Sequence, residues 1–247
     1  MAAGLRAALL VAGLLAAPAA AGAELPVDLE LVLAVDVSGS IDAEEAAQQR
    51  EGYVAALEDE AVLEAIQANP WGRIAVTYVE WASADYQRVV VGWALIDGPA
   101  AARAFVAALS AVAPAAARWT SISGVIDFAV PLFDGNGYAG ERRAIDISGD
   151  GPNNRGRPVR LARDEAVAQG IVINGLPILD DHPQPFGLPT PKELALDRYY
   201  AENVIGGPGS FMIPARSFAD FREAILAKLI REIAQGPGGH LRLAAGR

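Results

Sequence analysis

Oxygen-bearing side chains follow the first aliphatic strand-like segment of the chain in a closely spaced group. Asp36, Ser38 and Ser40 are separated by single residues and come directly after residues 29–35. The pattern predicts a carboxylate and a pair of hydroxyl groups on a tight loop between a buried strand and a helix. Hard divalent cations such as Mg²⁺ bind oxygen ligands, so the group suits a metal. Serine also caps helices often, and the triplet alone supports metal binding and helix capping equally.

Two further polar positions lie where other loops of the same fold are expected. Asp150 follows the aliphatic segment 143–148, and Thr120 directly precedes a predicted helix. Ligands of doubly wound sheets bind beyond the carboxyl ends of the strands, which selects the loops at Asp36, Thr120 and Asp150. Asp146 stays open as an alternative metal ligand, although a strand would place it about 13 Å back from Asp150.

The strands that would hold these loops alternate with helices along the chain. They are expected at residues 29–35, 73–81, 87–94, 143–148 and 171–176, with an edge strand near Ser210 to Ile213. The short turn between the second and third strands predicts an antiparallel hairpin, and the strand–helix alternation elsewhere predicts parallel pairing. The expected fold class is therefore α/β, doubly wound, with a mostly parallel sheet, one antiparallel edge strand and helices on both faces.

Start signals place the helices between these strands. Asp42 and Glu45 have the spacing of a capping box, which predicts a helix from that point through Ile66. Pro99 fits the first turn of the next helix, which is expected to reach about Val112. Further helices are expected through Phe133, from about Pro158, after the proline-rich loop 180–191, and over residues 217–234.

The amino terminus has the form of a secretory signal peptide. Arg6 precedes an apolar run from Ala7 to Ala17, and small residues continue to Ala23. That run is shorter than the roughly 20 apolar residues that span a bilayer, so it is not expected to be a membrane anchor. Cleavage after Ala23 is predicted, and the mature protein is expected to be periplasmic or secreted. The chain then divides into a signal peptide at 1–23, one domain at 24–235 and a flexible tail at 236–247.

The composition excludes several classes of partner. The formal net charge of −10 repels the phosphate backbones of nucleic acids and also anionic lipid. No later stretch is apolar for long enough to cross a membrane, so neither nucleic acid binding nor a membrane span is expected. Cysteine is absent, and the stability must come from a hydrophobic core, which a domain of this size can supply.

Three segments together resemble the metal-ion-dependent adhesion site of von Willebrand factor A and integrin I domains. Residues 35–40 resemble its first part, residues 120–126 its threonine loop, and Asp150-Gly151 its final aspartate. The order of elements agrees over nearly the whole mature chain. The resemblance implies a bound divalent metal, expected to be Mg²⁺ with Mn²⁺ or Ca²⁺ as alternatives. The implied ligands are Asp36, Ser38, Ser40, Thr120 and Asp150.

The same resemblance implies capture of a partner rather than catalysis. Ligands that are mainly hydroxyls leave the ion electrophilic, so an Asp or Glu carboxylate of a protein partner can displace a metal-bound water. Arg118 and Trp119 stand where the family usually has paired glycines, and we expect this bulky loop to narrow access to the metal. Residues 145–151 with Asn153 and Asn154 further resemble a bacterial exported subgroup of undefined function.

Other functions fit parts of the pattern. A haloacid-dehalogenase-like phosphatase would use Asp36 as its nucleophile beside Mg²⁺, but position 38 is serine rather than a second acid, and no suitably placed lysine follows Thr120. A serine hydrolase would rely on His182 or His240, and the sequence lacks a G-x-S-x-G motif. A metal-free scaffold would bind its partner through surface patches, for which Trp119 is the best aromatic candidate.

Overall fold

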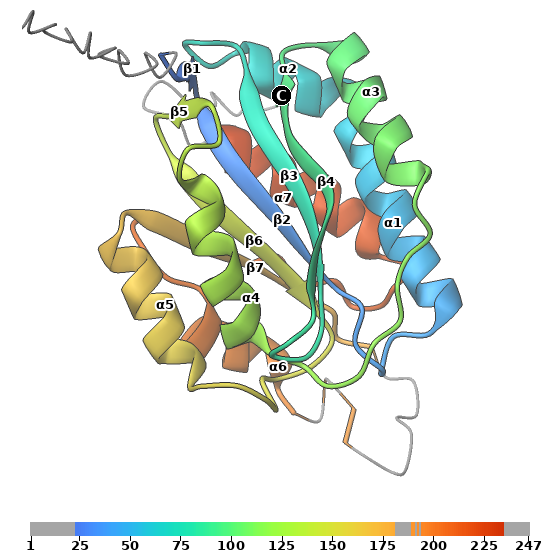
Figure 1. Cartoon of the computed structure of the whole chain (residues 1–247). Coiled ribbons are helices and arrows are strands. Elements are labelled where there is room, and N and C mark those ends of the chain that lie inside the picture. Colours follow the sequence, from blue (N-terminus) through green and yellow to red (C-terminus); the bar gives the residue numbers. More distant parts are fainter. Residues whose placement is uncertain (1–22, 181–188, 191, 193, 235–247) are drawn as a thin grey trace, which may run out of the picture.

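The computed structural model describes residues 23–180, 189, 190, 192 and 194–234 (Figure 1). The predicted signal peptide before Ala23, the tail at 236–247 and both histidines lie outside these described residues. None of the helices in the described part of the chain is both long and apolar enough to cross a membrane.

A five-stranded sheet forms the centre of the domain, with the strand order β4-β3-β2-β6-β7 (Figure 1). The strands are β2 (Leu29–Asp36), β3 (Ile74–Trp81), β4 (Gln87–Ile96), β6 (Arg143–Gly149) and β7 (Ile171–Pro177). Only the edge strand β4 runs antiparallel to its neighbour within this sheet. The predicted fold class is therefore confirmed, including the antiparallel hairpin of β3 and β4.

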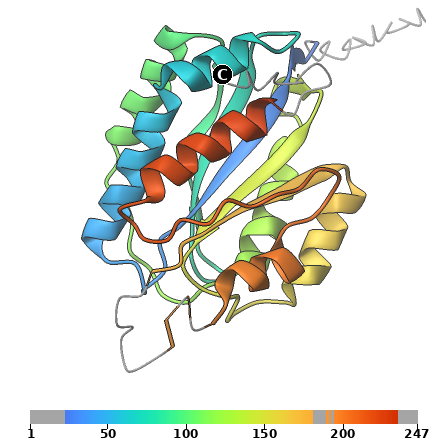
Figure 2. The same cartoon turned by 180° about the vertical axis from the view of Figure 1, so that it is seen from behind.

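Helices cover both faces of this sheet (Figures 1 and 2). One layer contains α1 (Ala43–Leu57), α2 (Glu60–Gln67), α3 (Pro99–Ser110) and α7 (Phe221–Ala234). The other contains α4 (Ile122–Ala129), the 3-10 turn Val130–Phe133, α5 (Val159–Ala168), α6 (Leu196–Tyr199) and the π-helical turn Tyr200–Val204. Successive residues of β2 alternate between the two cores, since Leu31 and Leu33 pack in the first and Val32 and Ala34 in the second.

The capping box at Asp42 is confirmed, but the helix that it starts is shorter than predicted. The Asp42 carboxylate accepts hydrogen bonds from the backbone N–H groups of Glu44 and Glu45, and the Glu45 carboxylate accepts one from the Asp42 N–H. The single helix predicted through Ile66 is in fact two helices. The carboxylate of Asp59 starts the second one by accepting a hydrogen bond from the N–H of Ala61 at 2.9 Å.

Two further predictions about the elements differ from the structure, and one pair of strands was not predicted. The edge strand expected at 210–213 is wrong, because this segment touches β7 only through isolated bridges such as Gly175 with Met212, and Pro214 has no N–H with which to continue a ladder. Helix α7 starts at Phe221 rather than Ser217. A parallel pair formed by β1 (Leu25–Val27) and β5 (Tyr138–Gly140) was not predicted, since three-residue strands leave no readable periodicity.

Candidate metal centre

Three loops meet at the carboxyl ends of the parallel strands, as the topology predicts. Backbone hydrogen bonds hold them in place. Ala117 donates its N–H to the carbonyl of Val37 at 2.9 Å, and Ser121 donates to the carbonyl of Ala82, in the turn between β3 and β4, at 2.7 Å. The loop after β6 is attached in the same way, because the N–H of Asn154 donates to the Thr120 carbonyl at 2.8 Å. The loop positions are thus fixed by main-chain contacts, independently of the side chains that they present.

Four of the five predicted ligands form a continuous chain of oxygen atoms. The Thr120 Oγ1 lies 3.4 Å from the Ser38 Oγ, which lies 3.4 Å from the Ser40 Oγ. The Ser40 hydroxyl in turn donates a hydrogen bond of 2.7 Å to Asp150 Oδ1. Residues 82 to 110 positions apart in the sequence are therefore brought together at one point.

Asp36, the fifth predicted ligand, is held at the base of this group. Its Oδ1 accepts a hydrogen bond of 2.8 Å from the N–H of Ser38. Its Oδ2 is buried and has no hydrogen-bond partner among the described residues. An unpaired carboxylate oxygen inside a protein is costly unless a cation or a donor reaches it. This orphaned oxygen fits a metal position beside the hydroxyl groups.

The helix-capping interpretation of the serines is wrong for this chain. Asp42, and not Ser38 or Ser40, caps α1. In the threonine loop, too, the residue that caps the helix is not the predicted ligand. Ser121 caps α4 by accepting a hydrogen bond from the Gly124 N–H, whereas the Thr120 hydroxyl contacts Ser38. The hydroxyl groups of the predicted ligand set are not occupied by helix ends.

Burial raises the pKa of both aspartates at the candidate metal centre, Asp36 and Asp150. It raises the pKa of Asp36 well above its usual range, and the neighbouring Asp150 raises it further. Burial likewise raises the pKa of Asp150 to about 6, although the Ser40 hydroxyl opposes this, and Glu45 and Asp180 add negative charge nearby. A divalent cation would remove this electrostatic cost.

The donor set fits a hard cation better than a soft one. It consists of carboxylates and hydroxyls, which suit Mg²⁺, Mn²⁺ and Ca²⁺. No cluster of three or more histidine, cysteine, aspartate or glutamate side chains is placed to hold a metal among the described residues. A site here therefore depends on the neutral hydroxyl groups as much as on the acids.

Asn153 and Asn154 contribute to the site in a way that sequence reasoning missed. The Asn154 Oδ1 accepts a hydrogen bond of 2.9 Å from the N–H of Thr120, and the Asn153 Oδ1 accepts one of 3.1 Å from the N–H of Ser123. Gly156 makes the close approach possible, since a β-carbon there would lie 2.6 Å from the Ser121 Oγ. The only sequence signal for a role of Asn153 and Asn154 was their position just after Asp150-Gly151.

Asp146 is not part of this group, and its interpretation as a metal ligand is wrong. Its carboxylate is buried against α7, where Oδ1 lies 2.6 Å from the Nζ of Lys228. Lys228 also contacts Glu232 Oε2 at 2.9 Å, and Glu232 Oε1 accepts a hydrogen bond of 2.7 Å from Asn174. We call Asp146, Asn174, Lys228 and Glu232 the α7 cluster.

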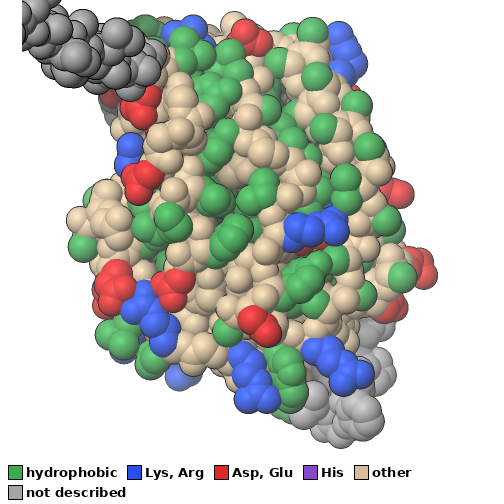
Figure 3. Space-filling model, in the orientation of Figure 1, with side chains coloured by type: hydrophobic (Ala, Val, Ile, Leu, Met, Phe, Trp, Pro, Cys, Tyr) green, Lys and Arg blue, Asp and Glu red, His purple; other side chains and the backbone are tan. Residues whose placement is uncertain are grey.

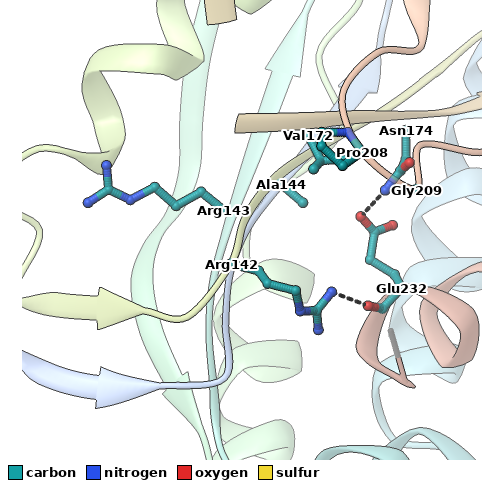
Figure 4. A pocket seen from close by; sticks show the side chains of 8 residues that line it. All are labelled: Arg142, Arg143, Ala144, Val172, Asn174, Pro208, Gly209 and Glu232. Atoms are coloured by element: carbon teal, nitrogen blue, oxygen red, sulfur yellow. Dashed lines mark hydrogen bonds between the residues drawn. The ribbon is translucent and has the colours of Figure 1, made fainter. Parts of the chain in front are cut away.

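A cavity of about 270 Å³ lies next to the α7 cluster, at the amino-terminal ends of β6 and β7 (Figure 4). Its polar walls contact one another: Arg142 donates hydrogen bonds to the carbonyls of Glu232 and Ile233 at 2.9 and 3.1 Å, and Asn174 holds the Glu232 carboxylate. These contacts attach the last turn of α7 to the sheet. The cavity is at the opposite end of the strands from the candidate metal centre.

A family model described as a protein of unknown function (DUF1194) matches residues 26–237. The chain belongs to this family. No curated protein matches the chain in sequence.

Solved structures similar to this DUF1194 chain include von Willebrand factor A domains. Proximal thread matrix protein 1 of the mussel byssus is 14% identical, with a TM-score of 0.59 over 83% of this chain and 47% of that chain. The pilus adhesin SpaC of Lactobacillus rhamnosus GG is 16% identical, with a TM-score of 0.58 over 84% of this chain and 30% of that one. A von Willebrand factor type A protein of Catenulispora acidiphila is 15% identical, with a TM-score of 0.54 over 84% of this chain and 43% of its own.

These similarities establish the von Willebrand factor A fold of the DUF1194 chain. The chain spans less than half the length of each of these three proteins. One crystal structure of the mussel protein, with a TM-score of 0.51, has zinc occupying its metal-ion-dependent adhesion site. A metal is thus found in that motif in a protein of the same fold.

Proposed function

We propose that this DUF1194 protein is an exported domain that binds a divalent metal, in the first instance Mg²⁺, and through it an acidic group of a protein partner. The proposed ligands are Asp36, Ser38, Ser40, Thr120 and Asp150. The single observation that carries the proposal is the convergence of their oxygen atoms from three separate loops, with contacts of 2.7 to 3.4 Å from Thr120 to Asp150.

Each residue has a distinct part in this proposal. Asp36 is fixed by the Ser38 N–H and offers its free Oδ2. Asp150 is oriented by the Ser40 hydroxyl, and Asn154 holds the backbone of Thr120 so that its hydroxyl faces Ser38. A bound divalent ion would supply a positive position that accepts a carboxylate oxygen from another molecule. The chain itself would supply the carboxylate and hydroxyl oxygens that hold the ion.

The comparisons support a role in adhesion or assembly. One neighbour in structure is a pilus adhesin and another comes from the mussel byssus, and the latter holds zinc in the corresponding type of motif. We therefore propose binding rather than catalysis.

Isothermal titration of chelator-treated protein with Mg²⁺, Mn²⁺ and Ca²⁺ tests the metal site. We expect binding of about one equivalent to the wild type and its loss in Ser38→Ala and Thr120→Ala, because each removes one oxygen ligand. Ser110→Ala is the matched control, since Ser110 is exposed at the end of α3. Equal heats for all four proteins would overturn the proposed ligand set, and absence of binding to the wild type would favour the metal-free scaffold. Release of phosphate from a test ester would instead support the phosphatase.

Export is the second part of the proposal. Cleavage after Ala23 would leave Glu24 as the first residue of a domain ending near residue 235, with β1 intact from Leu25 and paired with β5. Amino-terminal sequencing of the protein recovered from the periplasm or medium of a bacterial host tests this, and we expect Glu24 as the first residue. Intact Met1 on a cytoplasmic product would contradict it.

A further inference from the structure

Trp119 and two arginines form an exposed surface next to the candidate metal centre. We call Arg118, Trp119 and Arg155 the arginine–tryptophan rim. Trp119 is 53% exposed, and both arginines are exposed. The guanidinium carbon of Arg155 lies over the indole ring, 3.9 Å from its centroid. Such a pair is a rigid, amphipathic contact surface, and exposed tryptophan and arginine often dominate the energetics of protein interfaces.

The backbone of Trp119 adopts a conformation that needs support. Its φ of +67° lies in the left-handed region, which is a genuine outlier for a bulky side chain. The conformation is held from the next residue, because Asn154 accepts a hydrogen bond from the N–H of Thr120 and donates one to its carbonyl. Strain maintained in this way is commonly found at functional sites. Here it presents the indole ring to solvent beside Thr120.

The rim borders the loops of the metal centre on two sides. A β-carbon on Gly39, between Ser38 and Ser40, would lie 4.0 Å from the Cγ of Arg118. The N–H of Arg155 donates to the carbonyl of Thr120 at 3.2 Å. Figure 3 shows basic side chains on both sides of a hydrophobic patch at the lower end of the molecule, where these loops lie in Figure 1.

The charge of the rim is not balanced within the described part of the chain. Neither Arg118 nor Arg155 forms an ion pair there, whereas the nearby Arg157 pairs with both Asp127 and Glu165. The whole protein carries a formal net charge of −10. Two unpaired arginines beside one exposed tryptophan therefore form a local basic surface on an acidic protein, and this surface is complementary to carboxylates.

We propose that the rim is a second anchor for an acidic segment of a protein partner. One carboxylate of the segment binds at the metal centre, a second binds an arginine of the rim, and Trp119 packs against the segment. An extended segment covers about 7 to 14 Å in two to four residues, so acids at this spacing are the ones to test. This inference rests on the proposed metal-dependent capture and adds to it the requirement for two carboxylates.

Synthetic peptides test the inference without knowledge of the natural partner. The probes are acetylated, amidated Gly-Ser peptides that carry either one glutamate or two glutamates three residues apart, with a version in which the second glutamate is glutamine. Their binding to protein expressed from the full chain is measured by fluorescence anisotropy at about 0.15 M salt, with Mg²⁺ or with chelator. We expect the two-glutamate peptide to bind about tenfold more tightly, which corresponds to about 1.4 kcal/mol and matches a charge-assisted hydrogen bond.

Variants separate the rim from the metal centre. The double variant Arg118→Ala/Arg155→Ala should lose the tenfold preference while its titration with Mg²⁺ is unchanged. Arg103→Ala is the matched control, because it removes an exposed arginine from α3. Trp119→Asn should weaken the binding of both peptides several-fold, and asparagine tolerates the left-handed backbone so that the loop is retained.

The outcomes distinguish this inference from the proposed function. Metal binding with equal affinity for all three peptides, or with no affinity for any, would overturn the second anchor and leave the metal site standing. Tight binding of the two-glutamate peptide in chelator would also overturn it, because the two anchors would then not act together. Loss of Mg²⁺ binding itself would contradict the proposed function instead.

Discussion

Lys228 is the residue whose replacement tests most directly how this fold tolerates buried charge. Its ammonium group lies 2.6 Å from Asp146 Oδ1 and 2.9 Å from Glu232 Oε2, and all three side chains are at most 1% exposed. Lys228→Met keeps an unbranched side chain of similar length but leaves two carboxylates buried without their cation. Removal of one partner from a buried ion pair typically costs about 3 to 5 kcal/mol. We expect a loss of that size in the free energy of unfolding at pH 8.

The loss should depend on pH, because burial raises the pKa of Asp146 to about 7 even with Lys228 beside it. A carboxyl whose pKa is raised in the folded state binds its proton more tightly there, so its ionisation lowers the free energy of unfolding as the pH rises from about 4 to about 7. At 1.36 kcal/mol for each pKa unit, about three units correspond to about 4 kcal/mol in the wild type. Without Lys228 the pKa of Asp146 rises further, and the decline continues above pH 7. The loss in the variant should therefore be larger at pH 8 than at pH 4.5 by about 1 kcal/mol, because the two proteins differ in the ionisation of Asp146 only above pH 7.

Urea denaturation of chelator-treated protein, followed by circular dichroism at pH 4.5 and pH 8, measures this difference. Arg222→Met is the control, because Arg222 is exposed on the same helix. Adding Asp146→Asn to Lys228→Met should recover part of the loss at pH 8, since it removes one uncompensated charge. A loss below about 1 kcal/mol at pH 8, or the same loss at both pH values, would refute this account of the α7 cluster.

Three other substitutions test the candidate metal centre and the groups next to it, which include Tyr200, whose hydroxyl is affected by the charges of Asp36 and Asp150. Asp36→Asn should abolish Mg²⁺ binding in calorimetry and stabilise the metal-free protein by about 1 kcal/mol in thermal unfolding, because it removes a buried charge next to Asp150; a destabilised metal-free variant would contradict this. Tyr200→Phe should leave the stability unchanged or raise it by about 1 kcal/mol in urea denaturation, because the Tyr200 hydroxyl is buried without a described partner. Gly156→Ala should cost about 1 to 3 kcal/mol, since φ is +82° and a β-carbon would lie 2.6 Å from the Ser121 Oγ. An unchanged melting temperature would show that this loop relaxes freely.

The parts of the fold that were predicted correctly are those with local signals. Aliphatic runs identified the five strands of the main sheet, and Asp42 with Glu45 identified the start of α1. The boundary at Asp59 was missed because the apolar periodicity continues through it. The three-residue pair β1 and β5 was missed because it depends on contacts between residues more than a hundred positions apart.

In the candidate site, too, the features with local sequence signals were predicted and those that depend on distant contacts were not. The loops could be predicted because parallel strands bring their carboxyl ends to one edge, and the structure places all five predicted side chains there. The hydrogen bonds of Asn153 and Asn154 to the threonine loop depend on contacts across 30 or more positions and could not be predicted. The burial of Lys228 could not be predicted from the sequence either, since lysine side chains are rarely buried inside a protein.

Asp146 on β6 and Asp150 directly after it are both buried but differ in how their charge is compensated, and this difference bears on the proposed function. Asp146, within the strand, has the ammonium group of Lys228 at 2.6 Å. Asp150, directly after the strand, and its neighbour Asp36 form no ion pair with a lysine or arginine in the described part of the chain, and contact hydroxyl and N–H groups instead. This contrast supports the proposal that a divalent cation from solution compensates the second pair of carboxylates, which lies beside three hydroxyl groups. The topology places the proposed site at the carboxyl ends of the strands, where Asp36, Ser38, Thr120 and Asp150 are buried and Ser40 is partly exposed.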